Sequence, residues 1–116
     1  MRSENRATGA LMKILINLSM YSPLFYKNLS DEEIEHQIKK EGFVPLRISN
    51  APGYVYSPHE HPETKLIAVL QGELQLVVQK QKYLCKKYDK IVIPGNITHS
   101  AVVGKEGCTF FWAEKK

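Results

Sequence analysis

Three of the four histidines in this chain lie in two short segments, at a spacing that suits metal coordination. His59 and His61 are separated by one residue, and on an extended strand such residues share a face about 7 Å apart. Two imidazoles this close can chelate one ion if a third ligand comes from a neighbouring strand, and His99 is the obvious third. The sequence therefore predicts that these histidines bind one divalent ion, such as Zn, Fe, Ni or Mn.

A purely structural role for these histidines is the competing interpretation. A single histidine on a strand is more often a satisfied structural residue than a ligand. The structural interpretation is less favoured here, because three of the four histidines fall in the two segments. The fourth, His36, lies in a predicted helix, where we expect a solvated surface residue.

The first histidine segment resembles the first motif of the cupin superfamily. That motif runs from a Gly through five residues, His-x-His, three residues, a Glu and six residues to a second Gly. The residues that stand at the matching positions are Gly53, His59, His61 and Gly72. This resemblance implies an all-β double-stranded β-helix, the cupin jelly-roll barrel, of the small single-domain, conserved-barrel type.

The second histidine segment is similar to the second cupin motif through Pro94 and His99 only. Tyr88 and Asn96 replace the glycines of that motif, and Val103 replaces its closing Asn. The resemblance covers roughly residues 43–113. Because cupins often pair their sheets, it also implies a homodimer.

Lys65 is the main departure from the family pattern, because it stands where cupins usually carry a glutamate ligand. Three interpretations are open. Lys65 points away and leaves three histidines with open positions for water or substrate. Alternatively it points inward, as a cation that binds an acidic ligand or as a deprotonated base, and is then the candidate catalytic residue. In the third interpretation the site is metal-free and the histidines bind the ligand directly.

Three further residues near the motif are candidates for the site. Glu63 and Glu60 are carboxylates that could replace the lost glutamate ligand. Strand alternation places Glu60 on the face opposite the histidines, so Glu63 is the better candidate. The same alternation places Ser57 on the histidine face, where it would line the cavity.

Composition predicts one soluble domain. A chain of 116 residues with 43% hydrophobic and 24% charged residues is large enough for one core. The net charge of +4 does not by itself indicate nucleic-acid binding, since no binding motif accompanies it, and we expect neither a nucleic-acid nor a membrane partner. The lysines that cluster between residues 80 and 90 are expected to lie on an exposed hairpin and to block edge pairing.

The two cysteines and the N-terminus bear on location. Cys85 and Cys108 form no CxxC pair, so we expect buried free thiols and a cytoplasmic protein. Residues 1–28 are expected to form a partly flexible N-terminal arm. The apolar stretch Leu11–Tyr26 has a faint signal-peptide character, but no clear cleavage site follows it. Met12 is an alternative start of the chain.

Residues 29–116 are predicted to form the barrel domain, with a surface helix over residues 30–41. Ser30 and Glu33 have the spacing of a capping box, and Gly42 would end the helix. The pattern then predicts eight short strands, which are Phe43–Ile48, Gly53–Ser57, Leu66–Leu70, Glu73–Gln79, Tyr83–Lys86, Lys90–Ile93, His99–Val103 and Cys108–Ala113. Gln71-Gly72 and residues 104–107 are predicted to be turns.

Two functions from different classes follow from these residues and the resemblance. In the first, the protein is a metalloenzyme whose histidine-bound ion transforms a small polar or anionic molecule. The cupin family implies oxygenase, isomerase or decarboxylase activity without choosing among them. In the second, the same barrel is a non-catalytic module that binds or senses a small sugar or acid.

Overall fold

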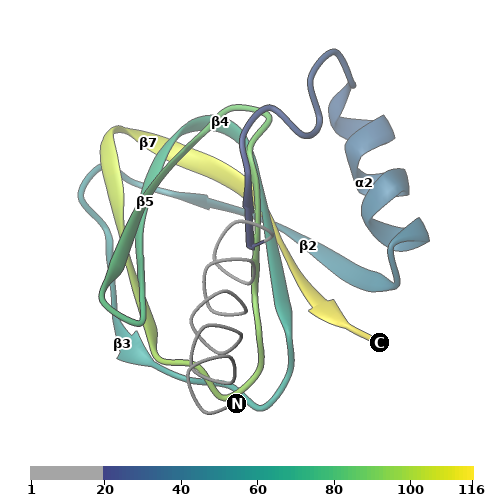
Figure 1. Ribbon diagram of the computed structural model, residues 1–116. Coiled ribbons are helices and arrows are strands. Elements are labelled where there is room, and N and C mark those ends of the chain that lie inside the picture. Colours follow the sequence, from purple (N-terminus) through teal and green to yellow (C-terminus); the bar gives the residue numbers. More distant parts are fainter. Residues whose placement is uncertain (1–19) are drawn as a thin grey trace, which may run out of the picture.

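The computed structural model describes residues 20–116, and within them the chain forms a β-barrel with one helix beside it (Figure 1). The elements are β1 (Tyr21–Ser22), α2 (Asp31–Lys40), β2 (Phe43–Asn50), β3 (Val55–His59), β4 (Lys65–Val78), β5 (Gln81–Lys86), β6 (Lys90–Ile93) and β7 (His99–Lys115). Every strand pairing is antiparallel. The predicted all-β barrel is therefore confirmed.

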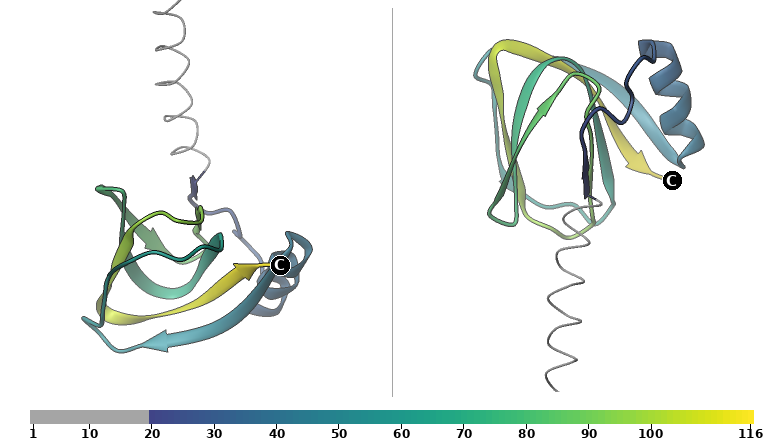
Figure 2. Two further views of the ribbon diagram at one scale, coloured as in Figure 1. Left: turned by 90° about the horizontal axis from the view of Figure 1, so that it is seen from below. Right: turned by 45° about the horizontal axis from the view of Figure 1, so that its top comes forward.

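Two long strands, β4 and β7, build both walls of the barrel. They pair with each other along almost their whole length, and both curve (Figure 2). The first half of β4 and the second half of β7 lie in one wall, in the order β1-β6-β4-β7-β2. Their other halves lie in the second wall, between β5 and β3. Each of the two long strands therefore crosses from one wall to the other.

Two predicted turns are wrong, because Gln71-Gly72 lies inside β4 and residues 104–107 lie inside β7. The register between the two strands shifts at these positions, so they are bulges that bend continuous strands. Gly72 and Gly107 both have a φ of +80°. The hairpin between β4 and β5 instead turns at Gln79 and Lys80, whose φ values of 49° and 70° suit a two-residue turn.

The bulge at Gly72 changes which residues of β4 face the barrel interior. Before it, Ile67 and Val69 point inward, and after it Leu74 and Leu76 do so. The parity of the inward positions therefore switches from odd to even at the bulge. The buried side chains of the interior are Met20, Ile67, Val69, Leu74, Leu76, Val78, Cys85, Ile91, Ile93, Ala101, Val103, Cys108 and Phe110.

A second apolar cluster joins α2 to the outer face of the barrel wall. Ser30 caps the helix with the predicted capping box, and Gly42 follows the helix with a φ of +92°. Ile34 and Ile38 are fully buried against the barrel. The buried members of this cluster are Tyr26, Ile34, Ile38, Phe43, Leu66, Ala68, Leu70, Phe111 and Ala113. The predicted surface helix is confirmed.

The segment before α2 is held to the barrel by buried Asp89. Its carboxylate accepts hydrogen bonds from the Tyr21 hydroxyl at 2.7 Å, the Leu24 N–H at 2.8 Å and the Lys86 N–H at 2.9 Å. Residues 20–28 of the predicted arm therefore pack on the barrel. The rest of the arm, with the start of the apolar stretch and Met12, lies outside the described residues.

The cysteines and the clustered lysines were also subjects of sequence predictions. Cys85 and Cys108 are buried free thiols, as expected. The β5 edge strand carries exposed lysines, also as expected, whereas Lys90 is half-buried and forms an ion pair with Glu41. Among residues 20–116, no helix is long and apolar enough to span a membrane.

Candidate metal centre

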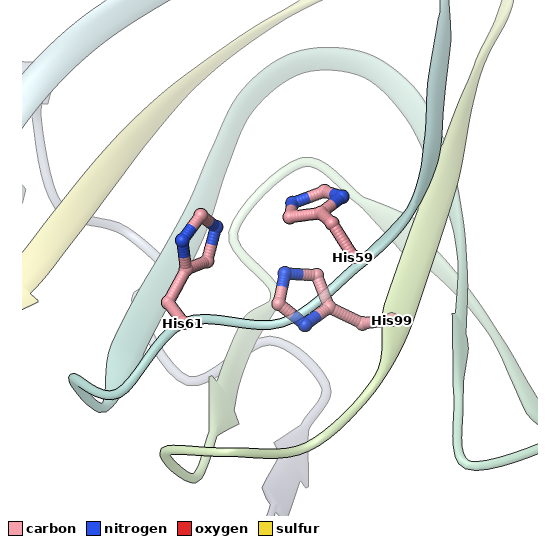
Figure 3. A group of neighbouring side chains, drawn as sticks. All are labelled: His59, His61 and His99. Atoms are coloured by element: carbon pink, nitrogen blue, oxygen red, sulfur yellow. The ribbon is translucent and has the colours of Figure 1, made fainter.

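The three histidines meet at one end of the barrel. His59 is the last residue of β3, His61 lies in the loop that follows, and His99 is the first residue of β7. His59 and His99 are directly paired across β3 and β7. Their rings face a common space (Figure 3), and the nitrogen atoms that could serve as ligands all lie within 4.8 Å of one another. The structure thus brings together the residues that the sequence singled out.

Contact between two loops sets the position of His61 relative to His99. The Asn96 N–H donates a hydrogen bond to the His61 carbonyl oxygen at 2.6 Å. A Cβ atom on Gly95 would lie only 2.1 Å from the Pro62 carbonyl oxygen, so the two loops meet backbone to backbone. Asn96, at a position where the cupin motif has glycine, has a φ of 61°. The other replaced glycine, Tyr88, also has a positive φ, of 76°.

Hydrogen bonds to backbone carbonyls fix the tautomers of two histidines. Nδ1 of His99 donates to the Ile97 carbonyl oxygen at 2.9 Å, and Nδ1 of His59 donates to that of Ser57. A carbonyl oxygen only accepts, so in the neutral ring Nε2 keeps its lone pair free. Nε2 of His61 and of His99 is buried and has no hydrogen-bond partner. Buried polar atoms are normally paired, so these two unpaired nitrogens fit metal ligands.

Burial and neighbouring charges favour the neutral form of two of the histidines, His61 and His99. Burial lowers the pKa of His61, and the nearby His59 and Lys65 charges lower it further. Burial also lowers the pKa of His99, although its hydrogen bond to Ile97 acts in the opposite direction. Neutral imidazole is the form that coordinates metals, so the donor set fits a divalent ion at neutral pH.

Lys65 lies inside the barrel wall, next to the histidines. Its side chain is 8% exposed, and its ammonium lies 3.5 Å from a carboxylate oxygen of Glu114 and 4.0 Å from one of Glu63. The same ammonium lies 5.5 Å from the centre of the Trp112 ring. The ring of Trp112 is in turn 5.9 Å from that of His61. The structure therefore places a buried cation at the margin of the histidine cluster.

The structure gives the other two candidate residues different surroundings from those expected. The Glu63 carboxylate faces Lys65, and Glu63 is not part of the group of clustered ligand atoms. The Ser57 side chain is exposed, and Tyr56 lines the interior cavity instead. Simple alternation placed Ser57 there wrongly, because the register of β3 shifts between Tyr56 and His59.

Two spaces adjoin the histidines. An apolar interior cavity of about 20 Å³ lies behind His59 and His99, with Trp112 as one wall. This volume is enough for about one water molecule. A larger open groove of about 670 Å³ borders His99, and it is lined by Pro58, Val77, Gln79, Lys80, Thr98, His99 and Ser100. The interior cavity therefore holds no ligand larger than water, and the groove borders the histidine cluster at His99.

Sequence reasoning missed Glu114 and Tyr56 as neighbours of the site. Glu114 joins the site because it is the direct cross-strand partner of Lys65, on β4 and β7. No short motif marks such a pair, since the two residues are far apart in the chain. Trp112 also lines the cavity.

Residues 45–114 match the family described as AraC-like ligand binding domain. This match covers more than half of the chain. The protein belongs to this family. No curated protein matches the sequence.

Solved structures place this AraC-like domain in the cupin superfamily. A Cupin 2 conserved barrel domain protein from Leptotrichia buccalis is 28% identical with a TM-score of 0.59, over 65% of this chain and 36% of that one. KdgF from a Halomonas species is 19% identical with a TM-score of 0.58, over 65% and 70% of the two chains. A protein of unknown function from Streptococcus pyogenes has the same identity and TM-score, over 65% of each chain. The alignment thus spans slightly less than two thirds of the streptococcal protein.

Proposed function

We propose that this protein holds a divalent metal ion with His59, His61 and His99 and uses it to bind a small polar or anionic molecule. The observation that carries the proposal is the pair of buried, unpaired Nε2 atoms on His61 and His99. They converge with His59, whose Nδ1 hydrogen bond leaves its own Nε2 available. Two buried nitrogens without a hydrogen-bond partner destabilise the fold unless an ion or ligand satisfies them.

The residues around the ion have defined tasks in this proposal. A bound divalent ion supplies a Lewis acid with open positions for an oxygen ligand. Ile97 and Ser57 orient the rings of His99 and His59 through their carbonyl oxygens. Lys65 contributes positive charge that favours an anion next to the ion, and Trp112 shields one side from water.

Elemental analysis of the purified protein tests the metal site. We expect near-stoichiometric iron, zinc, nickel or manganese in the natural sequence, and loss of that metal in a His59→Ala, His61→Ala double variant. His36→Ala is the matched control, because His36 is exposed on α2 and should leave the metal content unchanged. Absence of metal from the natural protein, even after reconstitution, would contradict the proposal.

A non-catalytic sensing role is the second candidate function. Membership of the AraC-like ligand binding domain family favours it, since the family is named for binding rather than for a reaction. Turnover assays on a panel of small acids and sugars, run beside calorimetric binding on the same panel, separate the two roles. Binding without turnover supports the sensor, and turnover that depends on the metal supports an oxygenase, isomerase or decarboxylase.

The homodimer and the cytoplasmic location stay predictions. Light scattering coupled to size exclusion measures the first directly. Cell fractionation measures the second.

A further inference from the structure

The inner face of the barrel wall continues past the histidines onto the edge strand β2. Direct cross-strand partners share a face, and Leu46 is paired with Trp112, which is paired with Ile67 of the interior cluster. In the next row, Val44 is paired with Glu114, which is paired with Lys65. Leu46 and Val44 therefore lie on the same face as Lys65 and Trp112.

These two apolar side chains have no cover among the described residues. Leu46 is 61% exposed and Val44 is 55% exposed, and they are neighbours on one face of β2. Exposed apolar groups that adjoin each other beside a polar site commonly mark a binding surface. Pro45 lies between them and has no N–H, which disfavours the addition of another strand along this edge.

Trp112 connects the exposed residues to the candidate metal centre. Its ring lies 5.9 Å from that of His61 and 6.4 Å from that of His99, and its backbone is paired with Leu46. One continuous surface thus runs from the histidines across the indole to β2. A molecule with one end at the histidines has an apolar surface beside it for its other end.

The positive charge of Lys65, at the end of this surface next to the histidines, is suited to an anion. The carboxylate oxygens closest to the Lys65 ammonium are 3.5 and 4.0 Å away, longer than the usual 2.7–3.2 Å of an N–H···O hydrogen bond. The ammonium therefore keeps donors for a ligand oxygen while it remains buried next to the histidines.

We propose that the ligand is a small carboxylic acid with an apolar tail, whose carboxylate lies at the histidines and Lys65 and whose tail lies on Trp112, Leu46 and Val44. This inference rests on the proposed function, and it adds the chemical class of the ligand. It predicts selection by tail length as well as by charge. A compact sugar or a short acid would leave the β2 surface uncovered.

A series of straight-chain acids tests the inference. Acetate, butyrate, hexanoate and octanoate are titrated calorimetrically into the metal-loaded protein, whose metal content is measured first. Affinity should rise with each added methylene until the surface is covered, by up to about fourfold per group. In Leu46→Glu this rise should disappear, so that hexanoate loses about tenfold more affinity than acetate does.

Leu84→Glu is the matched control, because Leu84 is 48% exposed on β5, away from this surface, and should leave the whole series unchanged. A flat series in protein with normal metal content overturns the inference and leaves the metal site standing. If no metal binds, the proposed function fails. The same series of acids, titrated into the metal-free protein, then still decides whether the surface binds apolar tails. If Leu46→Glu changes the oligomeric mass and not the series, this face is an interface between copies and the inference is wrong.

Discussion

The site depends on a few polar atoms whose partners are decided by neighbouring backbone. Carbonyl oxygens of Ser57 and Ile97 accept hydrogen bonds from Nδ1 of two histidines, which leaves Nε2 of each ring free for a ligand or ion. The position usually held by a glutamate ligand carries Lys65 instead, paired loosely with Glu114. A cation beside the three imidazoles weakens the attraction of the site for a metal ion and favours an anionic ligand.

Lys65→Glu should tighten metal binding, because it removes the positive charge and adds a carboxylate ligand. We expect a gain of about tenfold or more in affinity for zinc, measured by competition with a chromogenic chelator. Lys65→Met is the matched variant, since it removes the charge without adding a ligand and should give a smaller gain. Unchanged or weaker affinity in Lys65→Glu would mean that residue 65 does not occupy the fourth-ligand position.

At the scale of the elements, glycines allow two strands to serve both walls and two loops to meet. Gly72 bends β4 where its backbone meets that of Gly107 in β7. Gly95 lets the loop before β7 pack against Pro62, one residue beyond His61. The first contact sets the shape of the barrel, and the second sets the position of His61 relative to His99.

Gly72→Ala should destabilise the fold strongly. The new Cβ would lie 2.0 Å from the Gly107 carbonyl oxygen, at a φ of +80° that non-glycine residues rarely adopt. We expect a loss of about 3 kcal/mol or more in the free energy of unfolding, measured by urea denaturation. Gly42→Ala has a similar φ of +92° but meets no atom within 4 Å, so it should cost only about 1 kcal/mol. Equal losses in the two variants would show that the contact with Gly107 is unimportant.

Gly95→Ala should weaken metal binding more than it weakens the fold. The added methyl group pushes the Pro62 backbone away and moves His61 relative to His99. We expect zinc affinity to fall about tenfold, by analogy with changes to groups that orient metal ligands. Gly42→Ala serves again as the control, because it lies far from the histidines in the chain and should bind zinc normally. A normal affinity in Gly95→Ala would mean that the loops adjust without moving the ligands.

The whole molecule is held by two apolar clusters on either side of one barrel wall. The interior cluster contains both thiols, and burial raises the pKa of Cys85 to about 12 and that of Cys108 to about 11. Each thiol is therefore protonated in the folded protein at a pH where it ionises in the unfolded chain. The stabilisation from this difference is complete below the unfolded pKa of about 8.5 and is lost as pH rises toward the folded values.

Unfolding free energy should consequently fall between about pH 9 and pH 11. Urea denaturation at a series of pH values measures this, with a Cys85→Ala, Cys108→Ala double variant as the comparison. The variant should be less stable at pH 7 but should show a weaker decline with rising pH. Native thiols should also resist a chromogenic disulfide reagent at pH 8, because they are buried. An identical pH dependence in both proteins would contradict the assignment.

Features that depend on residues close together in the chain were predicted from the sequence, and features that depend on residues far apart were not. The helix cap at Ser30, the strand alternation and the histidine spacing are local, so the helix, the all-β class and the three histidines were all predictable. The turns at Gln71-Gly72 and residues 104–107 were predicted wrongly, because a glycine with positive φ has the same local pattern in a turn and in a bulge.

The sequence by itself determined the class of fold and singled out the three histidines, since strand alternation and the spacing of His59 and His61 are local features of the chain. Only the tertiary structure decided what surrounds them. Cross-strand register brought Glu114 to Lys65 and Leu46 to Trp112, and a register shift exchanged Ser57 for Tyr56 at the cavity. Register depends on pairing between residues far apart in the chain, and a one-residue shift moves a side chain to the other face.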